Sequence, residues 1–165
     1  MKLQLRRNNQ QSGKNSKSAS SDLSLYDYDG KDFKKVANIE FKALNTDHEK
    51  FRKDIEKIIK EGITGNWFHT LENIDGGTLP SLFDKFIYSF KKCSSLIDGN
   101  GEVSILFCIC VLDKKWACIK HFSYDSSKAS FEDYLDKFFD LEYSVKSGKI
   151  EVTDRRDWSL ISLVD

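Results

Sequence analysis

The sequence has almost no proline, since Pro80 is the only one among 165 residues, and it has no long apolar run. An apolar stretch of about 18 residues or more is the usual sign of a membrane helix, so the sequence predicts no membrane span. The N-terminus lacks the apolar core of a secretory signal, and we therefore expect a cytoplasmic location. In that compartment the four cysteines should be reduced.

The local motifs of common enzymes are also missing. The chain contains no G-x-G-x-x-G, no phosphate-binding P-loop, no H-E-x-x-H and no G-x-S-x-G nucleophile elbow. His121, Phe122 and Ser123 form the H-x-S of two-histidine phosphoesterases, but the required second copy is absent. The aspartates at 27–32 have the wrong spacing for an EF-hand calcium loop. We expect neither a cofactor nor a catalytic motif.

Acidic residues are absent from residues 1–21, which the formal net charge of zero conceals. The 21 basic residues that remain in residues 22–165 stand against all 26 acidic ones, so this body has a net charge of −5. Such an acidic body disfavours a nucleic-acid groove and permits a basic partner protein. The basic residues of the N-terminal segment are Lys2, Arg6, Arg7, Lys14 and Lys17.

Residues 1–30 are rich in Asn, Gln, Ser, Lys and Gly. They contain too few apolar side chains to offset the entropy lost on ordering. The sequence therefore predicts a disordered basic tail over residues 1–30 and a single globular domain over residues 33–165. One alternative function assigns the binding to this tail, as an adaptor for nucleic acid or another acidic surface.

Helical periodicity is clear in three stretches and ambiguous in a fourth. Thr46 and Glu49 form a predicted capping box, with Thr46 as the N-cap of a helix that ends at Gly62. A second helix is predicted to begin at Pro80 and continue to about Ile97, and a third to follow Ser130. The stretch 63–77 is interpreted as a short helix or turn.

Strand signals are strongest at 102–111 and 116–124, which predict a hairpin with Val111 opposite Trp116. Both faces of this hairpin are apolar, so we expect other elements to cover both sides. Weaker signals predict a first strand at 36–41 and a closing pair of strands at 149–154 and 158–164. The predicted fold class is α+β, with an antiparallel sheet centred on the 103–124 hairpin and packed with about four helices.

Three of the four cysteines lie in the predicted hairpin. Cys108 and Cys110 share one face with His121, and Cys93 could reach it from the preceding helix, which makes a Cys₃His metal site conceivable. However, structural zinc sites use C-x₂₋₄-C pairs in tight turns, and the neighbouring positions are apolar. A free cysteine usually behaves as a small buried hydrophobe. We interpret the region as core and predict no metal.

Acidic residues crowd the helix predicted after Ser130, where three of them follow an i, i+4, i+8 spacing. Like charges at this spacing destabilise a helix slightly, so stability alone does not favour the pattern. It is typical either of a solvated face or of a docking surface for a basic protein. The candidate partner-binding residues are Glu132, Asp133, Asp136, Asp140 and Glu142.

We therefore expect a non-enzymatic protein-binding module. The most plausible form is an inhibitor, immunity protein or antitoxin that binds and neutralises a basic partner, with complementary charge raising the association rate. The alternative is a small hydrolase or nuclease whose carboxylates converge only in three dimensions. Its candidate acids are Glu40, Asp125 and Asp154.

Overall fold

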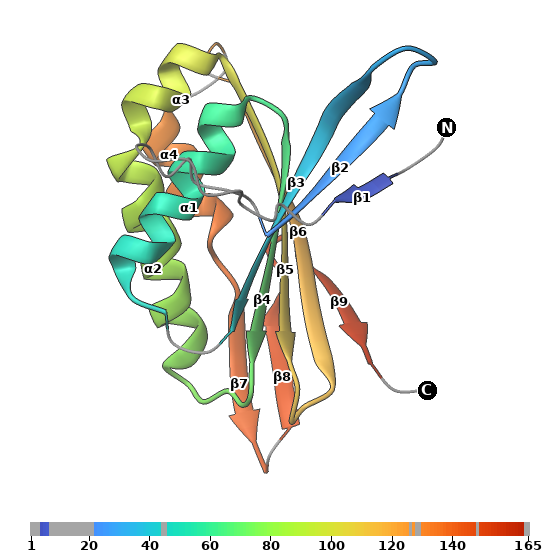
Figure 1. Ribbon diagram of the computed structural model, residues 1–165. Helices are drawn as coiled ribbons and strands as arrows, with labels where there is room; N and C mark the ends of the chain where they lie inside the picture. Colours follow the sequence, from blue (N-terminus) through green and yellow to red (C-terminus); the bar gives the residue numbers. More distant parts are fainter. Residues whose placement is uncertain are drawn as a thin grey trace.

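The computed structural model describes residues 4–6, 22–43, 46–125, 127, 130–147 and 149–163. It consists of a seven-stranded sheet in the order β1-β2-β3-β4-β5-β6-β9, a two-stranded sheet of β7 and β8, and a layer of helices (Figure 1). The helices are α1 (His48–Glu61), α2 (Thr78–Lys92), α3 (Ser94–Asn100) and α4 (Phe131–Phe138). The strands are β1 (Gln4–Arg6), β2 (Leu23–Tyr28), β3 (Phe33–Ala43), β4 (Thr64–Leu71), β5 (Glu102–Val111), β6 (Trp116–Asp125), β7 (Glu142–Lys146), β8 (Lys149–Asp154) and β9 (Ser159–Ser162).

The α+β class is confirmed, but the large sheet is mixed rather than antiparallel. β5 and β6 form the predicted hairpin, with Val111 opposite Trp116 and Ile105 opposite Phe122. In contrast, β3, β4 and β5 run parallel to one another. Parallel neighbours need a crossover connection, which α1 supplies between β3 and β4 and which α2 and α3 supply between β4 and β5. The middle strand of the sheet is therefore β4, and the hairpin lies to one side of it.

β4 is the element that the sequence pattern misplaced, because a short helix or turn was expected at 63–77. Gly65 lies inside this strand, although glycine is usually depleted in strands. A Cβ atom at Gly65 would collide with Cγ2 of Ile58 on α1. The glycine thus marks a close approach of α1 to the middle of the sheet, which is a known reason for glycine in a strand.

The helix α1 has the predicted buried stripe of Phe51, Ile55, Ile58 and Ile59. Its N-cap is Asp47 rather than Thr46, since the Asp47 side chain accepts a 2.9 Å hydrogen bond from the amide of Lys50. This bond holds the pKa of Asp47 below its usual value. At the other end Gly62 adopts a left-handed conformation, with φ of 60°, and its amide bonds the carbonyl of Ile59.

The predicted second helix is divided into two. α2 begins two residues before Pro80 and ends at Lys92, and α3 follows after Cys93. The aromatic side chains of α2 form the centre of the core. Phe86 stacks on Phe139 with ring centroids 5.0 Å apart and meets Phe107 of β5 edge to face at 4.8 Å. The core therefore lies between the helices and one face of the sheet.

All four helices cover the same face of the seven-stranded sheet (Figure 1). Successive side chains of a strand point to opposite faces. In β5 the fully buried residues Ile105, Phe107 and Ile109 lie on one face and alternate with Leu106, Cys108 and Cys110 on the other. The expectation that elements would cover both faces of the hairpin is wrong. One face packs on the helices, and no described helix lies on the other.

The N-terminal segment differs in part from the predicted disordered tail. β1 and β2 belong to the sheet, although both fall within residues 1–30, so the sheet begins before residue 33. β2 is anchored by Ser24, whose hydroxyl donates a 3.0 Å hydrogen bond to the buried side chain of Asn38. The remaining positions of the predicted tail up to residue 21 lie outside the described residues, and these include Lys2, Arg7, Lys14 and Lys17.

The two closing strands do not pair with each other as expected. β8 pairs with β7, whereas β9 pairs with β6 at the edge of the large sheet. The β7–β8 hairpin lies beside α2, because the Tyr143 hydroxyl donates to the carbonyl of Asp75 at 2.7 Å and accepts from the amide of Leu79. Trp158, just before β9, is buried and stacks on Phe83 with ring centroids 5.6 Å apart. No described helix has the length and apolar character needed to cross a membrane.

Candidate functional site

The face of the sheet opposite the helices is a continuous surface, which we call the open face. Its residues lie in register across neighbouring strands, so that Phe41, Phe68, Cys108 and Ile119 form one row across four strands. One further row lies on each side of this row. The open face consists of Ile39, Phe41 and Ala43 of β3, Asn66, Phe68 and Thr70 of β4, Leu106, Cys108 and Cys110 of β5, and Ala117, Ile119 and His121 of β6.

No acidic residue, lysine or arginine occurs on the open face, although 32% of the chain is charged. Phe41 is 53% exposed, and Phe68 stacks against it with ring centroids 5.5 Å apart. At the margins, Leu112 and Ile161 expose 56% and 40% of their surface. Scattered exposed apolar residues are normal, but a contiguous apolar face marks a binding surface in soluble proteins.

Cys108 and Cys110 lie at the middle of the open face, with their Sγ atoms 3.8 Å apart. Burial raises the pKa of Cys108 to about 12, so this thiol stays protonated and is a poor nucleophile at neutral pH. Cys93 and Cys118 are buried on the helix side instead. The conceivable Cys₃His site is therefore not assembled, and no group of three metal ligands occurs within the described residues.

The interpretation of the cysteine-rich stretch as core thus holds for one of its faces. Burial raises the pKa of Cys118 strongly and that of Cys93 to about 11, as expected for thiols inside an apolar layer. Cys110 is the one cysteine that is not classed with the buried residues. It is consequently the natural thiol probe of the open face.

The five candidate partner-binding acids do not form one line on α4. The helix ends at Phe138, so Asp140 and Glu142 lie beyond it. Both are paired with Arg156, whose Nε lies 3.3 Å from Asp140 and whose Nη2 lies 3.2 Å from Glu142. A bound arginine reduces the charge that these two carboxylates present to a partner.

The other three acids remain on α4. Glu132 and Asp133 lie in its first turn, where the helix dipole favours negative charge. Their position therefore has a local structural reason. Asp136 is a further turn along, and its carboxylate lies 3.4 Å from Nζ of Lys91 on α2. These three residues keep an exposed acidic surface that is smaller than the sequence predicted.

The acids proposed for a hydrolase do not converge. Glu40 is buried between β3 and α1, where it pairs with Lys57 and lies near Lys42. Asp125 accepts hydrogen bonds from the backbone and hydroxyl of Ser127, and Asp154 lies 2.9 Å from Nε of Arg156. Each carboxylate has its own separate partners, so they do not make a shared carboxylate site.

A serine–histidine pair lies at the border of the open face, and the sequence reasoning missed it. The Oγ of Ser104 and the Nε2 of His121 are 2.8 Å apart, within reach of a nucleophile and its base. The pair comes from adjacent strands, so only the hairpin register could have revealed it. His121 also borders a cavity of about 610 Å³ together with Tyr134 and Lys137. The other two histidines lie elsewhere, with His48 on α1 and His69 buried on β4.

A second cavity, of about 470 Å³, opens at the carboxyl end of β4 beside the first turns of α2. Ligands of open α/β sheets often bind at such strand ends. Two of its charged groups, however, are engaged within the chain. Lys85 donates to the carbonyl of Thr46 at 2.9 Å, and Asp75 accepts from the hydroxyl of Thr78, which holds the pKa of Asp75 below its usual value. Lys85 thus ties α2 to the segment before α1, and Asp75 stabilises the loop before α2.

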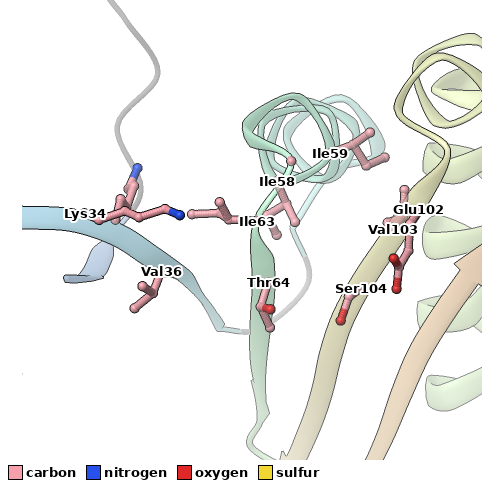
Figure 2. A pocket seen from close by; sticks show the side chains of 11 residues that line it. Lys34, Val36, Ile58, Ile59, Ile63, Thr64, Glu102, Val103 and Ser104 are labelled. Atoms are coloured by element: carbon pink, nitrogen blue, oxygen red, sulfur yellow. The ribbon is translucent and has the colours of Figure 1, made fainter. Parts of the chain in front are cut away.

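Figure 2 shows a third cavity, of about 520 Å³, between the end of α1 and the first residues of β4 and β5. The isoleucines Ile58 and Ile63 stand on one side, with Lys34 from β3 beside them and Glu102 on β5 across from it. The charged groups are of opposite sign and come from different strands. The cavity is therefore lined by apolar side chains together with charged groups of both signs.

The open face is the most extensive of these features. It could have been predicted from the sequence if β4 had been recognised as a strand. Over the segments 39–43, 66–70, 106–110 and 117–121, every second residue is uncharged along this face, which is the pattern of a buried surface. Comparison with known proteins gives no further guide to its role, because no protein-family model, curated protein or solved structure matches this chain.

Proposed function

We propose that this protein is a non-enzymatic protein-binding module and that the open face is its contact surface. The observation that carries the proposal is the uncharged, largely apolar character of this face over four adjacent strands. Covering such a surface lowers the free energy of the system by about 25 cal/mol per Å² of apolar area removed from water. Apolar and aromatic residues in the middle of a surface patch are also the usual anchors of protein interfaces.

A charge placed on the open face tests this proposal. Phe41→Lys introduces an ammonium group at an exposed position, so the fold should survive while the contact is lost. The matched control is Tyr88→Lys on α2, since Tyr88 is also an exposed aromatic residue but belongs to the helix layer. A protein captured by the wild-type chain is identified, produced separately and titrated against both variants.

The expected result is a large loss of affinity for Phe41→Lys and unchanged affinity for Tyr88→Lys. Burying an unpaired charge in an interface should weaken binding by a factor of about 30 or more, which corresponds to roughly 2 kcal/mol. Equal binding by both variants would show that the contact surface lies elsewhere on the molecule.

The acidic residues of α4 are an alternative contact surface for a protein-binding module. Glu132, Asp133 and Asp136 favour a basic partner there, in the role of an inhibitor, immunity protein or antitoxin. Reversal of these three charges to lysine should slow the association with a basic partner by at least about tenfold at low salt. An unchanged association rate would reduce these residues to a solvated face.

A hydrolase is the second candidate function, and Ser104 and His121 are the observation that favours it. In this role His121 takes the proton from the Ser104 hydroxyl as its oxygen attacks an ester carbonyl, and the alcohol leaves with that proton. Water, deprotonated by His121, then hydrolyses the acyl-serine and restores Ser104. The test is turnover of a simple ester by the purified chain and its absence in Ser104→Ala. Turnover that persists in Ser104→Ala would exclude this pair as the source of the activity.

A further inference from the structure

Together with its neighbours on β2 and β9, the open face has about the area that a protein interface needs. Five strands that contribute six residues each and β9, which contributes four, give a footprint of roughly 540 Å² at about 4.8 Å between strands and about 3.3 Å per residue. Two such faces in contact bury roughly 1,100 Å² together, just above the area of about 1,000 Å² that a biological interface should exceed. Leu23 on β2, beside Ile39, and Ile161 on β9, beside Ala117, extend the apolar surface at its two margins.

The remaining part of the chain between β1 and β2 does not have the composition of a cover. Residues 7–21 contain one apolar residue, Ala19, and are otherwise arginine, lysine, asparagine, glutamine, serine and glycine. An apolar face is covered favourably by apolar side chains, because polar groups lose their water without gaining partners. This segment therefore does not match the open face, and we consider another molecule as the occupant.

The absence of charge favours a second copy of this chain. In a symmetric dimer the same patch is present on both sides, so a charged residue in it would lose its water twice, once in each copy. The open face avoids this cost, because its one ionisable side chain besides the thiols is His121 at the border. A strongly basic or acidic partner would gain no electrostatic complementarity from the same surface.

The relief of the open face is also self-complementary. The row that contains Phe41, Phe68 and Ile119 is bulky over β3 to β6, and the next row, with Ala43 and Ala117, has smaller side chains there. On β9 the order is reversed, since Ser159 continues the first row and Ile161 the second. A two-fold axis that runs across the strands between these rows sets the bulky row of each copy against the small row of the other. Large and small side chains that alternate across an interface can interdigitate at core density.

We infer that the open face binds the open face of a second copy, so that two sheets pack face to face in a symmetric sandwich with the helix layers outside. The inference rests on the proposed function, since it names the partner of that same surface. Cys110 lies in the small row and becomes covered in the dimer.

Sedimentation equilibrium of the full chain tests the inference. Between about 1 and 100 μM, a range that brackets interfaces of this size, the average mass should rise from the 19.1 kDa of one chain toward twice that value. Phe41→Lys should raise the dissociation constant at least about tenfold, and Tyr88→Lys should leave it unchanged. Ile161→Lys, at the opposite margin, provides a second variant in case Phe41→Lys fails to fold.

The reaction of Cys110 with a thiol reagent gives a second readout. Its rate should fall as the concentration of the wild-type chain increases, and it should remain constant in Phe41→Lys. A wild-type chain that stays monomeric over the whole range overturns the inference, as does a dimer that both face variants leave intact. If the chain is monomeric but a different partner is lost in Phe41→Lys alone, the second-copy inference fails while the proposed function stands. If Phe41→Lys and Tyr88→Lys bind such a partner equally well, the second-copy inference and the proposed function both fail.

Discussion

Phe41 and Phe68 stack on the open face with ring centroids 5.5 Å apart and ring planes inclined by 27°. They are neighbours across the parallel pair β3 and β4, and Phe41 remains 53% exposed. The pair is thus outside the core, although both residues are aromatic. Its position separates two roles that sequence alone does not distinguish, namely packing in the folded chain and contact with another molecule.

Phe41→Ala should therefore cost little stability, about 1 kcal/mol or less, because much of its ring is already in water. Phe107→Ala is the matched comparison, since Phe107 is fully buried on the other face of the sheet. Its loss should cost about 3–5 kcal/mol by leaving a cavity. Urea unfolding at a low chain concentration measures both values. A cost for Phe41→Ala equal to that for Phe107→Ala would place the open face within the core.

The buried ion pair of Glu40 and Lys57 should be sensitive to removal of one partner. Lys57→Met leaves the Glu40 carboxylate in a layer where it is 1% exposed. We expect a loss of about 3–5 kcal/mol in the free energy of unfolding, the usual cost of an uncompensated buried charge. Lys50→Met on the exposed side of the same helix is the control and should change stability little. A similar small effect for both variants would contradict the burial of the pair.

The pH dependence of stability should report on Glu40. Burial raises the pKa of Glu40, although the neighbouring Lys57 opposes this effect. The folded state then holds the proton more tightly than the unfolded state, so the contribution of Glu40 to stability is full below its ordinary pKa of 4.5 and is lost as the pH rises through the folded pKa. The difference in unfolding free energy between the wild type and Glu40→Gln should therefore shift against the wild type as the pH rises above 4.5 and through the raised pKa of the folded state. A difference that is constant, or that shifts toward the wild type, would show that Lys57 outweighs the burial.

Gly65 should tolerate a larger residue only if Ile58 becomes smaller. Gly65→Ala places a methyl group against Cγ2 of Ile58, and we expect it to cost about 1–3 kcal/mol through overpacking. In the background of Ile58→Ala the same change should cost clearly less, because the colliding atom is gone. A double-mutant cycle measured by urea unfolding gives the coupling directly. Strict additivity of the two changes would mean that α1 does not lie this close to β4.

Cys118 and Cys110 should respond differently to substitution by serine. Cys118 is fully buried on the helix side of β6, where a hydroxyl would lack water, so Cys118→Ser should cost about 1–3 kcal/mol. Cys110→Ser on the open face should cost less than half of this, because Cys110 is in partial contact with solvent. Thermal unfolding of the two variants at equal low concentration compares them. The reverse order would contradict the assignment of the two sheet faces.

The sequence alone determined those helices and strands whose pattern depends only on residues that are close along the chain. The stripe of Phe51, Ile55 and Ile58 follows the helical period, and the register of Val111 opposite Trp116 follows from a short turn between two strong strands. Both are local patterns, in which the periodicity of apolar residues reports directly on the geometry of the backbone. The buried side of the cysteine-rich hairpin was predictable for the same reason.

Only the tertiary structure decided the position of β4, and with it the mixed sheet and the open face. Gly65 weakens the strand signal of Thr64–Leu71, because a glycine in a strand is favourable only where another element, here α1 at Ile58, comes too close for a side chain. Similarly, the acids after Ser130 are close in sequence, yet α4 ends at Phe138, so that Asp140 and Glu142 lie beyond the helix and pair with Arg156. An apolar strand face has the same composition whether helices cover it or not. Which face is covered depends on the side to which the crossover helices α1, α2 and α3 return, and this is a property of the whole sheet rather than of any segment.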